Sequence, residues 1–186
     1  MTLYHCSPTP GLHTLEPRVM PYFDKPCQLC LTELLPMALF YGIRHFEYPY
    51  GYTRAGELYY LEQFPGMLAE LYGGKSASLY LCEERPGMGR TAIPHERVTA
   101  EPVPVLREIA VPDLLAALRE QERRGAVRLI RWEQVDEANR RWIVDAEQRE
   151  IVERGLLDYP EEPMARYLRE KYPESWARAE RERSCP

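Results

Sequence analysis

Short apolar stretches separated by proline- and glycine-rich turns run through the first 110 residues. Four of them are apolar enough to predict strands, at residues 3–5, 27–32, 58–64 and 76–82. Two short helices are predicted between these strands, at residues 33–41 and 65–72. Thr32 is expected to cap the first helix, and Pro36 fits its first turn.

Residues 97–99 and 102–109 are predicted to be extended chain, but Pro102 and Pro104 exclude a regular central strand at their own positions. An edge strand or a bulge is therefore expected there. The other long connections, above all residues 8–26 and 46–57, are rich in proline or aromatic residues and are predicted to be loops.

From residue 111 onwards the pattern becomes helical. Helices are predicted at residues 112–125, 136–154, 163–172 and 173–183, with a short strand at 126–132. In the longest helix, Ala138, Trp142, Ala146 and Ile151 are expected to form one apolar stripe. The pattern therefore predicts the α+β class, with an α+β core over residues 1–110 and a helical extension over residues 111–186 packed on that core.

The net charge of −5 disfavours nucleic acid as a partner, because nucleic-acid binders usually present a basic surface. Five cysteines, without the spacing of a disulfide scaffold, favour reduced thiols. We find no signal peptide and no apolar run of about 18 residues, so we expect a cytoplasmic protein that does not cross a membrane. Tyrosine is abundant, with 13 residues against four phenylalanines, which suits a cleft or a stacking surface.

The first candidate for chemistry is His5-Cys6-Ser7, at the end of the first predicted strand and before Pro8. A histidine at a strand end, followed by small residues with an accessible backbone, can hold a small polar ligand. The alternative is a structural histidine whose ring is hydrogen-bonded to a neighbouring carbonyl. Two motifs further along the chain favour the ligand.

The three motifs are, in chain order, His5-Cys6-Ser7, then Leu29-Cys30-Leu31-Thr32 leading into Met37-Ala38-Leu39-Phe40-Tyr41, then Glu101 opening an extended segment. In this order they resemble the ADP-ribosyltransferase fold, specifically its poly(ADP-ribose) polymerase-like branch, whose His–Tyr–Glu triad comes from three separate strands. The resemblance implies a split β-sheet core with flanking short helices, followed here by a helical extension. The chain also resembles small uncharacterised bacterial proteins that open with Tyr-His-Gly-Ser.

The resemblance implies that the protein transfers ADP-ribose from NAD to an unknown macromolecular acceptor. It implies two catalytic residues, Glu101 for the ribose and its developing positive charge, and His5 for a ribose hydroxyl. The NAD-binding residues that it implies are His5, Cys6, Ser7, Thr32, Phe40, Tyr41 and Arg18. Phe40 aligns best with the aromatic that stacks on nicotinamide, and Arg90 is an alternative to Arg18 for the pyrophosphate.

Three positions depart from the family pattern. Cys6 replaces a glycine, Leu29 stands near the position of the strand tyrosine, and Pro102 directly follows Glu101. These departures leave open a non-catalytic module that binds NAD or ADP-ribose. They also leave open a protein-interaction module, in which residues 48–60 form a tyrosine-rich surface for a partner or a second copy of the chain. An RNA 2′-phosphotransferase of the same fold would require a basic face, which the acidic composition disfavours.

Each functional assignment has a structural alternative. Phe40 and Tyr41 can be core residues, Glu101 a solvated loop carboxylate, and Arg18 a surface residue. Cys27 and Cys30 are spaced as C-x-x-C, but one such pair supplies only two of the four ligands that zinc requires. On a strand the two side chains would also point to opposite faces. We therefore expect no metal site.

Overall fold

The chain folds as a mixed α+β protein with antiparallel sheets, as the pattern predicts. The computed structural model describes residues 1–19 and 27–184. Two units can be distinguished, one formed by Met1–Tyr60 with Leu68–Leu129 and the other by Leu61–Met67 with Ile130–Pro186. The sequence pattern suggested a boundary near residue 110, whereas the units divide after Leu129.

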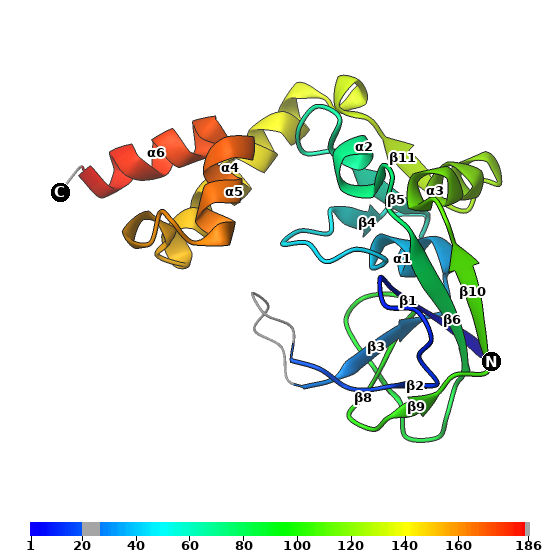
Figure 1. The fold of residues 1–186 in the computed structure, drawn as a ribbon. Helices are drawn as coiled ribbons and strands as arrows, with labels where there is room; N and C mark the ends of the chain where they lie inside the picture. Colours follow the sequence, from blue (N-terminus) through cyan, green and yellow to red (C-terminus); the bar gives the residue numbers. More distant parts are fainter. Residues whose placement is uncertain (20–26, 185–186) are drawn as a thin grey trace. The chain divides into compact units, whose positions relative to one another are not determined.

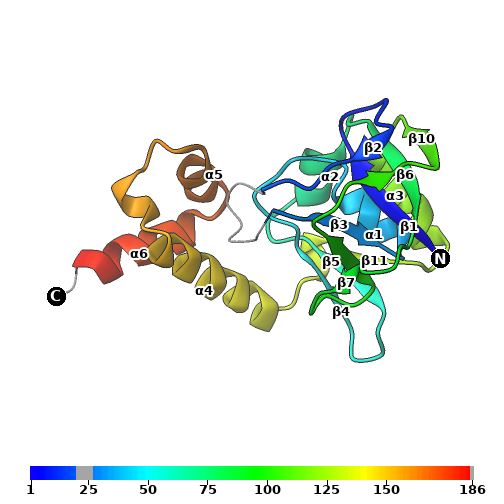
Figure 2. The ribbon, with the colours of Figure 1, turned by 90° about the horizontal axis from the view of Figure 1, so that it is seen from below.

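The first unit is built on a six-stranded sheet in the order β10-β6-β1-β3-β8-β7, with every neighbouring pair antiparallel (Figure 1; β7 is labelled in Figure 2). Its strands are β1 (Thr2–Ser7), β3 (Leu29–Thr32), β6 (Ala77–Glu83), β7 (Gly89–Arg90), β8 (Glu96–Thr99) and β10 (Arg107–Val111). Six residue pairs join β1 to β6, from Thr2↔Glu83 to Ser7↔Ser78. On its other side, β1 pairs with β3 only at Tyr4↔Thr32. The sheet therefore opens between these two central strands beyond that pair.

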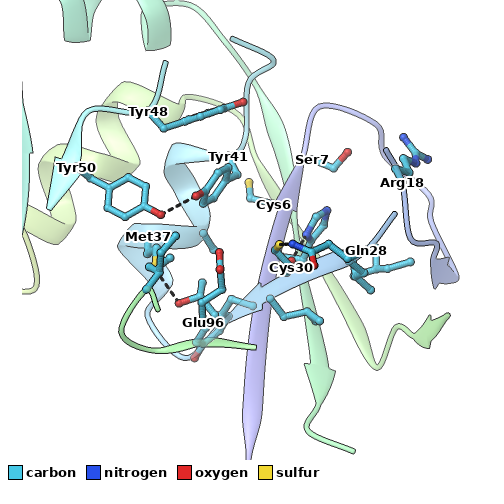
Figure 3. A pocket seen from close by; sticks show the side chains of 18 of the residues that line it. Cys6, Ser7, Arg18, Gln28, Cys30, Met37, Tyr41, Tyr48, Tyr50 and Glu96 are labelled. Atoms are coloured by element: carbon cyan, nitrogen blue, oxygen red, sulfur yellow. Dashed lines mark hydrogen bonds between the residues drawn. The ribbon is translucent and has the colours of Figure 1, made fainter. Parts of the chain in front are cut away.

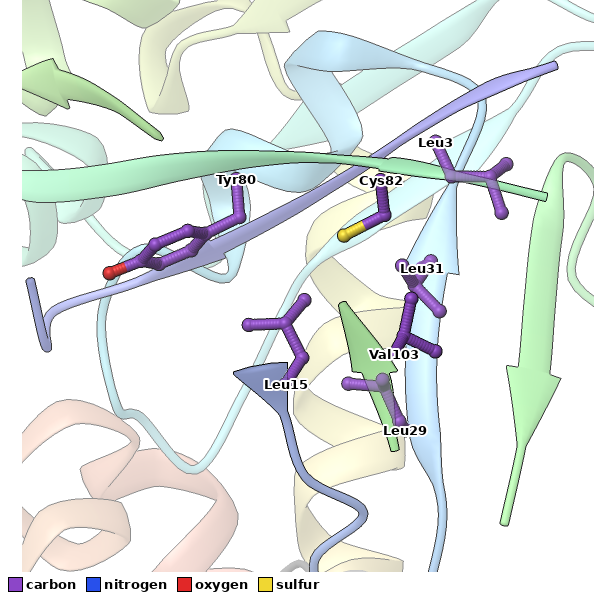
Figure 4. Packing of buried hydrophobic residues seen from close by; sticks show 7 residues of the cluster. All are labelled: Leu3, Leu15, Leu29, Leu31, Tyr80, Cys82 and Val103. Carbon is purple, nitrogen blue, oxygen red and sulfur yellow. The ribbon is translucent and has the colours of Figure 1, made fainter. Parts of the chain in front are cut away.

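Two smaller sheets accompany the main one. The two-stranded sheet joins β2 (Thr14–Leu15) to β9 (Val103–Pro104), so the proline-rich segment does lie outside the main sheet. The three-stranded sheet has the order β11-β5-β4, made of Arg128–Ile130, Leu58–Leu61 and Tyr50–Tyr52. The two-stranded sheet and the main sheet share a core cluster of Leu3, Leu15, Leu29, Leu31, Tyr80, Cys82 and Val103 (Figure 4).

Helix α1 (Leu35–Phe40) packs against β1 and β3. It begins two residues later than predicted, because Leu34 rather than Thr32 is its N-cap residue. The Thr32 hydroxyl still holds the helix start, since it accepts the Leu34 N–H at 3.1 Å and lies 3.2 Å from the Met37 sulfur. The position of α1 relative to the sheet is thus set by a residue of β3.

Two more helices complete the first unit, α2 (Met67–Tyr72), which belongs to it from Leu68 onwards, and α3 (Leu114–Arg123). Helix α3 packs on α1, and the Leu114 N–H donates to the Lys75 carbonyl at 2.9 Å. Leu114 and Leu118 are fully buried in this contact. This packing explains why α3 belongs with the sheet rather than with the later helices.

The second unit is mainly helical (Figure 2). Its elements are η1 (Trp132–Gln134), α4 (Glu137–Glu153), η2 (Leu156–Asp158), α5 (Pro163–Lys171) and α6 (Pro173–Ser184). The Asp136 side chain caps α4 by accepting the Asn139 N–H at 2.8 Å, and Gly155 closes the helix with φ 64°.

The expected apolar stripe on α4 is wrong at Trp142, whose exposed fraction is 54%. Ala138 is exposed as well and Ala146 is half-buried, whereas Ile151 is buried as predicted. The other buried residues of this helix are Ile143 and Glu147, each one position after a residue of the predicted stripe. No helix among residues 1–19 and 27–184 has the length and apolarity needed to cross a bilayer.

Candidate functional site

A pocket of about 580 Å³ lies where the central sheet opens between β1 and β3. Ligand pockets usually enclose about 300–1,000 Å³, so the volume suits a small molecule. Its walls come from several segments of the first unit: β1, residues 12–18, β3, α1, residues 41–48, β4 and residues 92–96. In Figure 3, Met37, Tyr41, Tyr50 and Glu96 lie on one side and Gln28, Cys30 and Arg18 on the other.

His5 is a half-buried lining residue on β1. Its Nδ1 lies 3.1 Å from the carbonyl oxygen of Cys30 on β3, so the ring bridges the opening of the sheet. Burial lowers the pKa of the imidazole below its usual 6.5, and the charge of Arg18 lowers it further. A neutral ring facing a carbonyl must carry its proton on Nδ1, because a carbonyl can only accept. Nε2 is therefore a hydrogen-bond acceptor.

The lowered pKa of His5 predicts a pH-dependent stability. The unfolded chain takes up a proton near pH 6.5, before the folded chain does, so the stabilisation is complete above that pH. It is lost progressively as the pH falls through the lower pKa of the folded state. In urea unfolding, the free energy of unfolding should therefore fall less between pH 8 and pH 5 in His5→Asn than in the native chain. Asparagine at this position cannot titrate but can still donate to the Cys30 carbonyl. Equal losses in both proteins would contradict this prediction.

Cys6 and Ser7 follow His5 and also line the pocket. The Cys6 side chain is 2% exposed and packs against Gly42, where a β-carbon would come within 3.0 Å of Sγ. Burial raises the pKa of its thiol to about 12, so it stays protonated and unreactive at neutral pH. The Ser7 hydroxyl accepts the Thr9 N–H at 3.2 Å. The Cys6 side chain is thus directed into the core.

The buried carboxylate of the pocket belongs to Glu96, not to Glu101. Glu96 is the first residue of β8, pairs with Thr32 of β3 and is only 2% exposed. Its Oε2 accepts the Thr91 hydroxyl at 2.6 Å. Within residues 1–19 and 27–184, Oε1 receives no hydrogen bond. A nearly buried carboxylate with one open oxygen is an unusual group in a ligand-sized pocket.

Glu101 is exposed and lies outside the pocket lining. β8 ends at Thr99, so Glu101 falls in the bend after it, where its N–H donates to the Thr99 hydroxyl at 3.0 Å. Pro102 then leads into β9, which pairs with β2 rather than with the main sheet. The structure therefore brings His5 together with Glu96 and does not bring it together with Glu101.

Tyrosines form the aromatic wall of the pocket. The Tyr41 and Tyr50 hydroxyls are 2.7 Å apart and the two rings meet edge to face, with Tyr48 nearby (Figure 3). Tyr52 also lines the pocket. Burial raises the pKa of Tyr50 to about 12 and raises that of Tyr41 further. Both phenols are therefore neutral, and their hydroxyls lie within hydrogen-bonding distance of each other.

Phe40, the expected stacking residue, is not part of this wall. Its ring is fully buried and packs on three tyrosine rings. The distance between ring centroids is 5.7 Å to Tyr50, 5.2 Å to Tyr60 and 6.4 Å to Tyr72. At the end of a six-residue helix, neighbouring residues point in different directions, and here Phe40 faces the core while Tyr41 faces the pocket.

Cationic groups lie at the rim. Arg18 is exposed, lines the pocket and exchanges two backbone hydrogen bonds with Gln28, at 3.2 and 3.3 Å. Arg44, which sequence reasoning did not single out, also lines it. Arg90, the alternative to Arg18, lies on the edge strand β7 and is not a lining residue. Thr32 lines the pocket, although its hydroxyl is occupied by the start of α1.

Among residues 1–19 and 27–184, no three His, Cys, Asp or Glu side chains are grouped so that they could hold a metal ion. Cys27 is exposed and Cys30 half-buried, and both are free thiols.

Comparison with family models, with curated proteins and with solved structures finds no match to this chain. The geometry of the pocket is therefore the basis for assigning a function.

Sequence reasoning missed Glu96, Tyr50 and Tyr52 as pocket residues. A signal for Glu96 was available, because it opens the short alternating stretch Glu96-Arg97-Val98-Thr99, which forms β8. Tyr50 and Tyr52 share a strand and point to the same side of it, which their spacing of two could have indicated. What no local pattern indicates is the pairing of β8 with β3, which brings the carboxylate to the pocket.

Proposed function

We propose that the protein transfers ADP-ribose from NAD to an acceptor, and that Glu96 takes the catalytic role first expected of Glu101. The observation that carries the proposal is the pair of His5 and Glu96 in one pocket. They come from β1 and β8, the two strands that flank β3. A triad drawn from three separate strands is what the resemblance to ADP-ribosyltransferases leads one to expect, and the opening between β1 and β3 supports the split-sheet core.

The hydroxyl groups of a ribose are hydrogen-bond donors, and the pocket contains acceptors for them. His5 Nε2 and Glu96 Oε1 are both acceptors without a partner in the described parts of the chain, and ribose hydroxyls are donors. The main chain at Cys6 can supply the donor and acceptor that a carboxamide needs, because its side chain is turned into the core. The rings of Tyr41 and Tyr50 can pack on nicotinamide, and Arg18 or Arg44 can meet the pyrophosphate.

In the reaction, the bond between the ribose carbon C1′ and the nicotinamide nitrogen breaks, and nicotinamide leaves with the bonding electrons as a neutral molecule. The ribose then carries a developing positive charge, which a carboxylate held in a low-dielectric site stabilises more strongly than water does. The acceptor forms the new bond to C1′ and loses its proton to solvent. Glu96 is nearly buried, so it meets the electrostatic requirement of this step.

One observation favours a second candidate, a module that binds NAD or ADP-ribose without catalysis. On β3, Leu29 is a core residue and Cys30 lines the pocket, so no strand aromatic stands where the family has a tyrosine. The tyrosines of β4 occupy the neighbouring wall instead. If the β4 tyrosines take the place of the strand tyrosine, the catalytic function is favoured; if they do not, the non-catalytic binding module is favoured.

Calorimetric titration of the full chain with NAD, combined with an assay for released nicotinamide, tests the proposal. We expect saturable binding together with release that continues over time and scales with protein concentration. Binding without release would favour the non-catalytic module. Absence of both would overturn the assignment of NAD to this pocket.

A further inference from the structure

The segment that carries Glu96 is held by Glu33, the residue immediately after β3. One carboxylate oxygen of Glu33, Oε2, lies 3.2 Å from Nδ1 of His95. Its other oxygen, Oε1, forms an ion pair with the Arg97 guanidinium. The main chain takes part as well, since the Glu33 N–H donates to the His95 carbonyl at 3.0 Å. A single residue thus contacts both chain neighbours of Glu96.

The backbone beside Glu96 is in an unfavourable conformation. His95 has φ 65°, the one left-handed value outside glycine among residues 1–19 and 27–184. Residues with a β-carbon keep a left-handed backbone conformation only when surrounding contacts impose that conformation. Such positions cluster at functional sites. The contacts here are Glu33 on His95 itself and the Tyr52 hydroxyl, which donates to the Pro94 carbonyl at 2.9 Å.

The direction of the side chains explains what this arrangement achieves. Glu96 and Arg97 are successive residues of β8 and therefore point to opposite faces of the sheet, while His95 lies in the turn just before the strand. Arg97 is only 4% exposed and is anchored a second time by Glu84, with Nε 2.8 Å from Oε1. Fixing the residue before Glu96 and the residue after it therefore restricts the direction in which the Glu96 side chain points.

We propose that Glu33 is a positioning residue, which orients the Glu96 carboxylate by bridging His95 and Arg97, the two chain neighbours of Glu96. The role of Glu33 in turnover rests on the proposed function, whereas its role in ordering this segment does not. Glu33 remains ionised over a wide pH range, because the hydrogen bond with His95, and next the charge of Arg97, lower the pKa of its carboxyl.

Glu84 provides a matched control. Like Glu33, it is a partly exposed carboxylate that pairs with Arg97, but no contact joins it to His95 in the described residues. Glu33→Gln and Glu84→Gln each remove one negative charge from the same guanidinium. Only the first also weakens the contact with His95, because an uncharged amide bonds an imidazole less strongly than a carboxylate does. The difference between the two variants therefore separates positioning of Glu96 from general stabilisation of the fold.

Two measurements report the positioning. The Glu96 N–H donates to the Ile93 carbonyl at 3.3 Å, so native-state hydrogen exchange of this amide reports the order of the segment without any ligand. We expect exchange about tenfold faster in Glu33→Gln than in Glu84→Gln. In nicotinamide release we expect kcat to fall roughly ten- to a hundredfold in Glu33→Gln, with KM changed much less, since misplacing a catalytic group acts on the chemical step.

Equal exchange and equal kcat in the two variants would overturn the proposal. If the wild-type chain releases no nicotinamide, the proposed function fails, and the exchange rates alone then judge the positioning. If Glu33→Gln does not fold, His95→Gly replaces it, because glycine tolerates the left-handed conformation while the ring contact is lost. Faster exchange at Glu96 supports the proposal there too, and unchanged exchange refutes it.

Discussion

Replacing Glu96 by glutamine is expected to slow nicotinamide release from NAD strongly, while the same replacement at Glu101 leaves the rate unchanged. Glutamine keeps the size of the side chain and can still accept the Thr91 hydroxyl. It removes the negative charge that would stabilise the developing cation. Losing such a group costs roughly 10²–10³ in kcat, which initial-rate measurements at saturating NAD would resolve.

Glu101→Gln is the matched control for this experiment, because it makes the same chemical change on an exposed residue outside the pocket. Thermal unfolding of both variants should show that the fold is intact. A loss of release in Glu101→Gln, with activity kept in Glu96→Gln, would return the catalytic role to Glu101 and contradict the proposed site.

Phe40→Ala is expected to lower the free energy of unfolding by about 3–5 kcal/mol, the usual effect of deleting a fully buried phenylalanine. Its ring packs on Tyr50, Tyr60 and Tyr72, so the cavity left behind lies among rigid aromatic neighbours that collapse poorly. Urea unfolding followed by far-ultraviolet circular dichroism measures the change. Tyr159→Ala serves as a control, because this side chain is 63% exposed and its removal should change stability by no more than about 0.5 kcal/mol.

The same variant separates two roles for Phe40. A core residue affects NAD affinity only through the position of Tyr50, whereas a stacking residue would affect affinity without a large loss of stability. A small change in the unfolding midpoint, together with a strong loss of NAD binding, would therefore contradict the core assignment.

Much of the element order could be predicted from local pattern, because these signals act within a few residues. The strand at β1, the strand at β3, the Asp136 cap of α4 and its closing Gly155 all follow from apolar runs and end signals in the sequence. The α+β class follows from the same pattern. None of this depends on which strands are neighbours.

The site depends on pairing, which local pattern does not contain. Glu96 and Glu101 both precede extended chain, and only the pairing of Thr32 with Glu96 shows which one reaches the pocket. Phe40 and Tyr41 are both aromatic at a helix end, and their roles are decided by what lies on each side of α1. Trp142 shows the limit of periodicity, since a shift of one position moves a residue from the core to the surface.

The division into two units has a practical consequence for spectroscopy. The three tryptophans of the chain, Trp132, Trp142 and Trp176, all belong to the helical unit. Excitation selective for indole therefore yields emission from that unit alone. The pocket-bearing unit contains no tryptophan and gives no indole emission. A tryptophan substituted at Tyr4 or Tyr59 would give this unit a fluorophore of its own. The thermal unfolding of the two units could then be compared between the native chain and that variant.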